Sequence, residues 1–111
     1  MAGKEVIVAM LALFVKLRAK PGKRDEVKML WEEHVKPHSE SEDAVDISCY
    51  CYAAEEENTI WLFELLSSPS VAKKAMQSEW FAAYQNAIGP LLMAPPEINT
   101  ATPVWVKHLQ G

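Results

Sequence analysis

The sequence predicts an α+β fold in which strands and helices follow the order β-α-β-β-α-β. Three observations predict it. Apolar and polar residues alternate over residues 45–52, a spacing of two that indicates a strand. Two segments, one after Pro21-Gly22 and one after Ser78, repeat apolar residues at helical spacing. Half of the 111 residues are hydrophobic, which is enough for one domain with one core. This order is the split βαβ arrangement of a ferredoxin-like fold with a four-stranded antiparallel sheet.

The first strand and helix are expected before residue 38. Residues 6–18 favour a strand through their β-branched content. The run is apolar like a signal peptide, but it continues into Lys16-Leu17-Arg18 instead of a small-residue cleavage site. A turn at residues 20–23 then precedes a helix with apolar positions from Val27 to Val35. Pro37 is expected to end or kink this helix, and residues 39–43 to form an acidic loop.

The remaining elements follow from similar patterns. Strands are expected over residues 45–52 and 59–66, joined by a charged hairpin tip. Ser68 and Ser78 are candidate N-caps of two helices. The second helix is expected to continue as far as Pro95-Pro96, with one large apolar face formed by Trp80, Phe81, Tyr84, Ile88, Leu91 and Leu92. A last strand is expected over residues 97–109.

Charge and cysteine content exclude several classes of function. The net charge is −4 and no basic stripe is present, so no nucleic-acid partner is expected. The sequence has no basic amphipathic helix of the kind that binds a membrane surface. The apolar run that begins at residue 6 is too short to span a bilayer. Cys49 and Cys51 would share one face of a strand and could not close an unstrained disulfide. We interpret them as small buried hydrophobes of a reduced, cytoplasmic protein.

The sheet is expected to have one face that its own helices leave uncovered. A homodimer formed through the sheets would cover that face, because twofold dimers are the commonest assemblies. The aromatic residues expected at this interface are Tyr50, Tyr52, Trp61 and Trp105.

Glu64 is a carboxylate inside an otherwise apolar strand. It is a candidate pocket base with a raised pKa, able to take a proton from a phenol. The alternative is a structural carboxylate paired with Lys16 or Arg18 on a neighbouring strand.

His34 is a second candidate for proton transfer, because histidine titrates near neutrality. The alternative is a core histidine with a backbone partner. His34 and His38 have the i, i+4 spacing of a metal-binding pair. Pro37 interrupts that spacing and no third ligand is evident, so no metal site is expected.

Aromatic residues are the candidates for contacting a flat ligand. They could equally form an ordinary core, since an aromatic stripe at helical spacing is common there. The set comprises Trp31, Phe63, Trp80, Phe81 and Tyr84.

Three stretches together match the pattern of a known family. They are Leu17-Arg18-Ala19-Lys20-Pro21-Gly22-Lys23 with Asp25-Glu26-Val27, then Leu62-Phe63-Glu64 before a serine-rich helix start, and then Ser78, Phe81, Ile88-Gly89-Pro90-Leu91-Leu92 and Pro95-Pro96-Glu97-Ile98. Through these stretches the chain resembles the antibiotic biosynthesis monooxygenase family over residues 6–106. It implies a dimeric α/β barrel with an apolar cavity between sheet and helices in each subunit. It also implies oxidation of quinols or anthrones by molecular oxygen without metal, flavin or haem.

Three positions depart from that family's pattern. Leu66 stands where many members have Trp, and Ala75 where many have His. Phe14 stands where the haem-degrading branch has Asn, so haem degradation is not expected. Phe14 and Leu66 remain candidates for lining the pocket. We therefore expect a cofactor-independent monooxygenase assisted by Glu64 or His34, and the alternative is a non-redox binding module or isomerase on the same fold.

Overall fold

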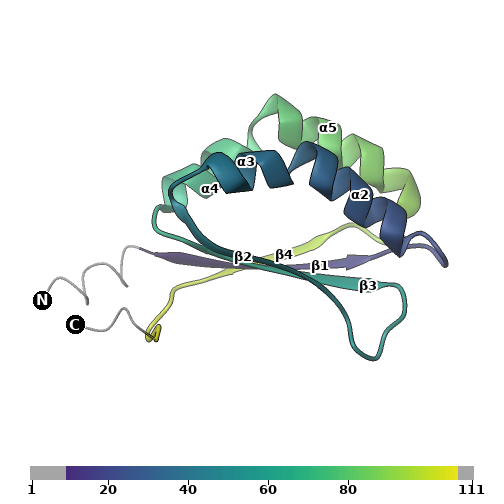
Figure 1. The fold of residues 1–111 in the computed structure, drawn as a ribbon, viewed down its shortest axis with the longest axis horizontal. Coiled ribbons are helices and arrows are strands. Elements are labelled where there is room, and N and C mark those ends of the chain that lie inside the picture. Colours follow the sequence, from purple (N-terminus) through teal and green to yellow (C-terminus); the bar gives the residue numbers. More distant parts are fainter. Residues whose placement is uncertain (1–9, 108–111) are drawn as a thin grey trace, which may run out of the picture.

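The structure is a computed structural model that describes residues 10–107. Its elements are β1 (Leu11–Arg18), α2 (Arg24–His34), α3 (Lys36–Ser41), β2 (Val45–Tyr52), β3 (Thr59–Leu66), α4 (Pro69–Met76), α5 (Glu79–Ile88), the 3-10 helix η1 (Gly89–Leu91) and β4 (Glu97–Ala101). The strands form one antiparallel sheet in the order β2-β3-β1-β4, and the helices lie on one of its faces (Figure 1). The predicted ferredoxin-like α+β class is confirmed.

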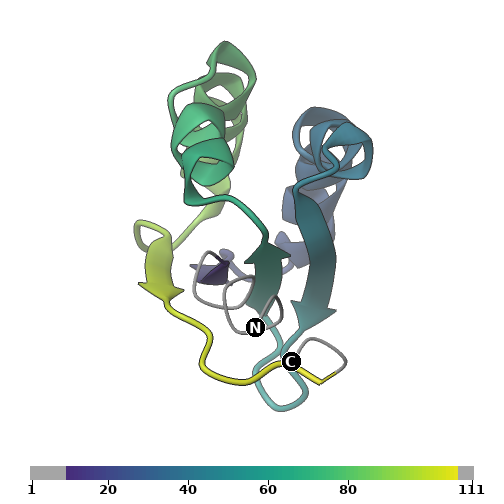
Figure 2. The same ribbon diagram turned by 90° about the vertical axis from the view of Figure 1, so that its left-hand side faces the viewer.

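The core lies between the helices and the two central strands. In β1, Val15 opposes Leu62 of β3 on one side and Ile98 of β4 on the other. The largest fully buried side chains are Ile60, Ile88 and Val27. Figure 2 shows two helical stacks above the sheet, with α2 and α3 in one and α4 and α5 in the other.

The predicted turn before α2 is confirmed. Gly22 has a φ of 76°, a backbone conformation that glycine adopts at little cost in free energy because it has no Cβ atom. The N–H of Lys23 donates to the carbonyl of Lys20 over 2.9 Å and closes the turn. Asn58 Oδ1 accepts from the N–H of Gly22, so the turn is held against the β2–β3 hairpin.

The prediction of an acidic loop over residues 39–43 is wrong. Residues 36–41 form α3 instead. Pro37 lies in the first turn of this helix, where a missing N–H costs no hydrogen bond. Proline therefore ends one helix and begins the next, and α3 continues along the edge of the helical layer.

The prediction of one helix from Ser78 to the Pro95-Pro96 pair is also wrong. Ser78 does cap α5, because its Oγ accepts from the N–H of Phe81 over 3.2 Å. The helix ends at Ile88, since Pro90 has no N–H with which to continue it. The chain then turns back to the end of β1, where Met93 N–H donates to the carbonyl of Arg18 over 2.8 Å.

The first and last strands of the sequence differ in extent from the prediction. β1 begins at Leu11, and residues 6–9 of the expected strand lie outside the described residues. β4 ends at Ala101, so Val104, Trp105 and Val106 do not belong to a strand. Residues 108 and 109 of that prediction also lie outside the described part. Within residues 10–107, no helix is both long and apolar enough to cross a membrane.

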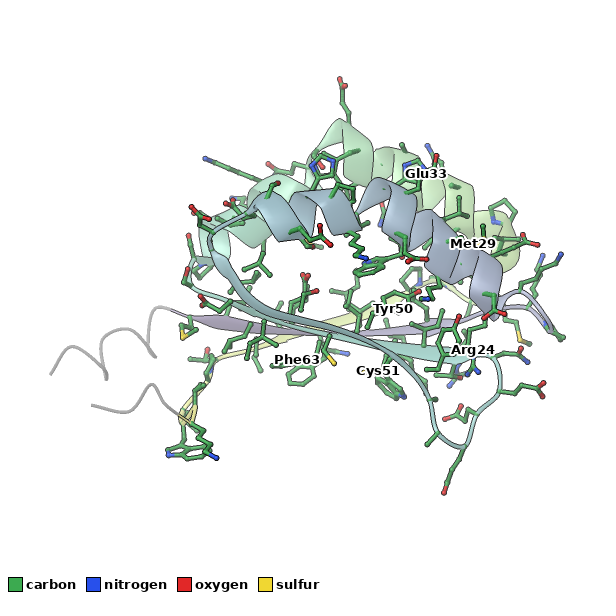
Figure 3. The ribbon with its side chains drawn as sticks, viewed as in Figure 1. Arg24, Met29, Glu33, Tyr50, Cys51 and Phe63 are labelled. Carbon is green, nitrogen blue, oxygen red and sulfur yellow. The ribbon has the colours of Figure 1, made fainter. Side chains whose placement is uncertain are left out.

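The face of the sheet away from the helices is partly apolar. Phe14, Ile47 and Trp61 are 44, 46 and 43 % exposed there. Cys49 and Cys51 are exposed on the same face, so the prediction that they are buried is wrong. Both are free thiols, with their Sγ atoms 3.4 Å apart. Figure 3 shows Cys51 and Phe63 pointing away from the helical layer.

Tyr50 and Tyr52 do not lie on this open face, contrary to prediction. Tyr50 points towards the helices (Figure 3), and its ring lies 4.4 Å from that of Trp31, centroid to centroid. The hydroxyl of Tyr52 donates to Asp25 Oδ1 over 2.6 Å, so Tyr52 is tied to the start of α2. Of the four predicted interface aromatics, Trp61 lies on the open face, and Trp105 is exposed beyond β4.

Candidate active site

A cavity of about 400 Å³ lies between the sheet and the helices. Every strand except β2 contributes to its wall, and α2, α3, α4 and α5 form the remainder. The apolar and aromatic lining consists of Leu13, Val15, Leu17, Trp31, Val35, Leu62, Leu66, Val71, Ala72, Ala75, Met76, Trp80, Phe81, Tyr84, Ile88, Pro96 and Ile98. The polar side chains on the wall are His38, Ser39, Ser41, Glu42, Glu64, Lys74 and Gln85. A mainly apolar cavity of this size with few polar groups suits a small organic ligand.

Six of the nine predicted site residues line this cavity. They come from three separate regions of the sequence and meet because α2, β3 and α5 surround the same space. They are Trp31, Glu64, Leu66, Trp80, Phe81 and Tyr84.

Phe14, Phe63 and His34 do not line the cavity. Phe14 and Phe63 are direct cross-strand partners whose ring centroids lie 5.2 Å apart on the open face. Successive side chains of a strand point to opposite faces, so Phe63 cannot share a face with Glu64. His34 ends α2 and is half-buried outside the cavity wall. The structure therefore does not bring these three residues to the candidate site.

Glu64 lies on β3 and places its carboxylate on the sheet side of the cavity. Its Oε2 accepts a hydrogen bond from Ser48 Oγ over 2.9 Å and another from Ser39 Oγ over 3.3 Å. Burial raises the pKa of Glu64 above its ordinary value, and the two hydroxyls lower it in part. Within residues 10–107, no ion pair joins Glu64 to Lys16 or Arg18, so the ion pair predicted for the structural alternative is wrong. Lys16 lies instead over the Trp61 ring, 5.1 Å from its centroid, on the open face.

His38, not His34, is the histidine on the cavity wall. Its ring is stacked on Trp80 of α5, with centroids 4.1 Å apart and an interplanar angle of 8°. Sequence reasoning treated Pro37 as a barrier and considered His38 only as a metal partner of His34. Proline is common in the first turn of a helix, so Pro37 could have indicated a second helix that carries His38 and Ser39.

Two buried polar atoms beside the cavity have no hydrogen-bond partner among the described residues, Trp31 Nε1 and the Tyr50 hydroxyl. Burial and nearby acidic groups raise the pKa of Tyr50, and burial raises that of Tyr84. Both phenols therefore stay neutral at physiological pH and can act as hydrogen-bond donors. Glu64 is then the acceptor best suited to a ligand's acidic proton.

The positions that depart from the family pattern also fall near the cavity. Leu66 and Ala75 both line it, so small apolar groups occupy the places where the resemblance implies an indole and an imidazole. Phe14 faces away from it. The helix α4 carries no histidine, and the cavity wall has His38 from α3 and Glu64 from β3 instead.

Comparison with known proteins supports the fold. No family model and no curated protein matches the chain. Among solved structures, a putative antibiotic biosynthesis monooxygenase from Caulobacter crescentus superposes with a TM-score of 0.80 at 20% identity, over 91% of this chain and 95% of that one. One from Chloroflexus aurantiacus gives 0.72 at 23% identity, over 90% and 98%. A Nitrosomonas europaea protein of unknown function gives 0.75 at 22% identity, over 94% and 98%. The predicted resemblance to the antibiotic biosynthesis monooxygenases is confirmed at the level of the fold.

Proposed function

We propose that this protein is a cofactor-independent monooxygenase that oxidises a quinol- or anthrone-like aromatic molecule in the cavity between sheet and helices. One observation carries the proposal: a carboxylate with a raised pKa, Glu64, faces a mainly apolar, aromatic cavity. The fold shared with the putative monooxygenases supports the same conclusion.

Such a reaction needs little from the protein beyond a base and a dry cavity. A phenol or its keto form becomes electron-rich when it loses a proton, and Glu64 is the group that accepts it. In anthrone oxidation, the CH2 carbon becomes a carbonyl with one oxygen atom of O2. The other oxygen leaves as water with the two methylene hydrogens, so the substrate itself supplies the electrons. The aromatic wall holds the ring and excludes water.

Oxygen uptake on a panel of hydroquinones and anthrones, with a chelator and without added flavin, tests this proposal. We expect uptake to depend on substrate and to fall by about 10²–10⁴-fold in Glu64→Gln, the usual size of a general-base contribution. Glu33→Gln is the matched control, because Glu33 points outwards from α2 (Figure 3). No uptake with any substrate would contradict the proposal, as would full activity in Glu64→Gln.

A second function is favoured by Leu66 and Ala75. Without the histidine that the resemblance implies at Ala75, the cavity could bind its ligand or isomerise it without using oxygen. Glu64 would then move a proton between two atoms of the ligand. A ligand that binds only the folded state raises the melting temperature, so thermal-shift screening without oxygen finds the ligands. Oxygen uptake measured with each of these ligands then separates the two functions. A ligand that stabilises the protein but causes no oxygen uptake when oxygen is present would favour this second function.

We further propose that two copies pair through the open face of the sheet. No helix of the described part covers that face, and Phe14, Ile47 and Trp61 are exposed on it. Light scattering at micromolar concentration should give a dimeric mass, and Phe14→Glu should reduce it to that of a monomer. The control is Met29→Glu on the outer surface of α2, which should leave the mass unchanged. A monomeric mass for the unmodified protein would contradict this pairing.

A further inference from the structure

Two serine hydroxyls from different elements meet on one oxygen of Glu64. Ser48 lies on β2 directly opposite Glu64 in the strand pairing, and its Oγ donates to Oε2 over 2.9 Å. Ser39 lies on α3, and its Oγ donates to the same oxygen over 3.3 Å. A carboxylate has two oxygens that together accept about four hydrogen bonds. Within residues 10–107, both side-chain hydrogen bonds to Glu64 go to Oε2, so Oε1 accepts no side-chain hydrogen bond and can accept one from a ligand.

We propose that Ser39 and Ser48 are positioning residues that hold Oε2 of Glu64, so that Oε1 is the atom that takes the ligand's hydroxyl proton. The inference rests on the proposed function for the identity of that ligand. Its structural content does not, because both hydroxyls donate directly to Glu64 itself. Neither serine is a catalytic residue, since each acts through the carboxylate.

The two hydroxyls also offset the effect of burial on Glu64. Burial disfavours the charged carboxylate, and hydrogen-bond donors favour it. The pKa of Glu64 remains raised, so the bonds offset burial only in part. A base of this kind binds a proton more readily than an exposed glutamate, which is the property that general-base catalysis needs.

Other titratable groups face the same cavity and must be considered in any pH measurement. They are His38 on α3, Glu42 just after it, Lys74 on α4 and Tyr84 on α5. Tyr50 on β2 lies on the same side of the sheet as Ser48 and remains neutral because its pKa is raised. The lining residues from α2, β1 and β4 carry no charged side chain. The causes that shift the pKa of Glu64 are burial and the two serines.

Carbon NMR titration of the Glu64 carboxyl in the ligand-free protein tests the inference. The resonance is assigned by its loss in Glu64→Gln. Ser48→Ala and Ser39→Ala should each raise the proton affinity of Glu64, by roughly tenfold for Ser48→Ala, because a hydrogen bond to a charged group contributes about that much. The effect should be smaller for Ser39→Ala, whose bond is longer. Ser48→Thr keeps a hydroxyl and should restore the original titration.

Ser41→Ala is the matched control. Ser41 lies on α3 and lines the same cavity, but its hydroxyl donates to the carbonyl of His38 and not to Glu64. Its removal should leave the Glu64 titration unchanged. An unchanged titration in both Ser48→Ala and Ser39→Ala would overturn the inference, and so would an equal shift in Ser41→Ala.

The titration separates this inference from the proposed function, because it uses neither substrate nor oxygen. If oxygen uptake depends on Glu64 but the Glu64 titration is unchanged in both serine variants, the inference about the serines is wrong and the proposed function stands. If the titration responds as expected and no quinol or anthrone is oxidised, the proposed function is wrong and the positioning role stands. In an active protein, the acid limb of the kcat/KM profile should move to higher pH in Ser48→Ala.

Discussion

His38 stacks face to face on Trp80, with the two ring centroids 4.1 Å apart. His38 belongs to α3 and Trp80 to α5, so the pair joins the two helical stacks that Figure 2 shows apart. Both side chains line the cavity, and His38 is exposed. The pair therefore lies where the cavity meets solvent.

The stacked pair should contribute measurably to stability. A double-mutant cycle with His38→Ala and Trp80→Ala should give a coupling energy of about 0.5–1.5 kcal/mol, the range for aromatic pairs. The measurement is urea denaturation of the four proteins. A parallel cycle with His34→Ala, whose side chain lies outside the cavity wall, should give coupling near zero. Equal coupling in the two cycles would show that the stack contributes nothing specific.

A bulky residue at position 75 should block the cavity. Ala75 lines the cavity from α4, so Ala75→Phe places a ring in the space that a ligand would occupy. Ligand affinity measured by thermal shift should fall at least tenfold, or about 1.4 kcal/mol. Ala83→Phe adds the same ring to the exposed side of α5 and should keep the affinity. Unaltered binding in Ala75→Phe would mean that the ligand binds elsewhere.

The stability of the protein should depend on pH through Glu64. Its pKa is raised by burial, so the folded protein holds this proton more tightly than the unfolded chain. Between the ordinary glutamate pKa of about 4.3 and the raised value, the free energy of unfolding falls as pH rises. Glu64→Gln removes this dependence, so its stability relative to the unmodified protein should increase with pH across that interval and then level off.

Urea denaturation at a series of pH values measures this difference. Glu33→Gln, an exposed glutamate on α2, should show no such trend relative to the unmodified protein. A stability difference for Glu64→Gln that is constant with pH, or one that shrinks as pH rises, would mean that burial does not raise the pKa of Glu64.

Local patterns predicted most of the fold. Strand alternation and turn chemistry placed β2, β3, α2 and the Gly22 turn correctly, because these features depend on neighbouring residues. The same alternation rule places Phe63 and Glu64 on opposite faces of the sheet, so the prediction that both face the ligand conflicts with it. The errors at Pro37 and Pro90 share one cause. A proline can begin a helix as well as end one, and which of these occurs depends on contacts with the rest of the fold.

The candidate site was less predictable than the fold. Glu64, Trp31 and the aromatic residues of α5 were found because each is conspicuous in its own segment. Ser39, Ser48 and His38 were missed because their roles depend on the pairing of β2 with β3 and on the position of α3 over the sheet. A serine or an exposed histidine has no local signal that distinguishes such a role.

The four tryptophans of the chain give the most direct measurement of where the ligand binds. Trp31 and Trp80 line the cavity, whereas Trp61 and Trp105 do not. A hydroquinone titrated without oxygen should shift the indole N–H resonances of Trp31 and Trp80 until saturation and leave those of Trp61 and Trp105 in place. The same titration of Ala75→Phe should need at least tenfold more ligand to reach the same shifts. Shifts confined to Trp61 or Trp105, or none at any tryptophan for every aromatic ligand of the panel, would contradict the account.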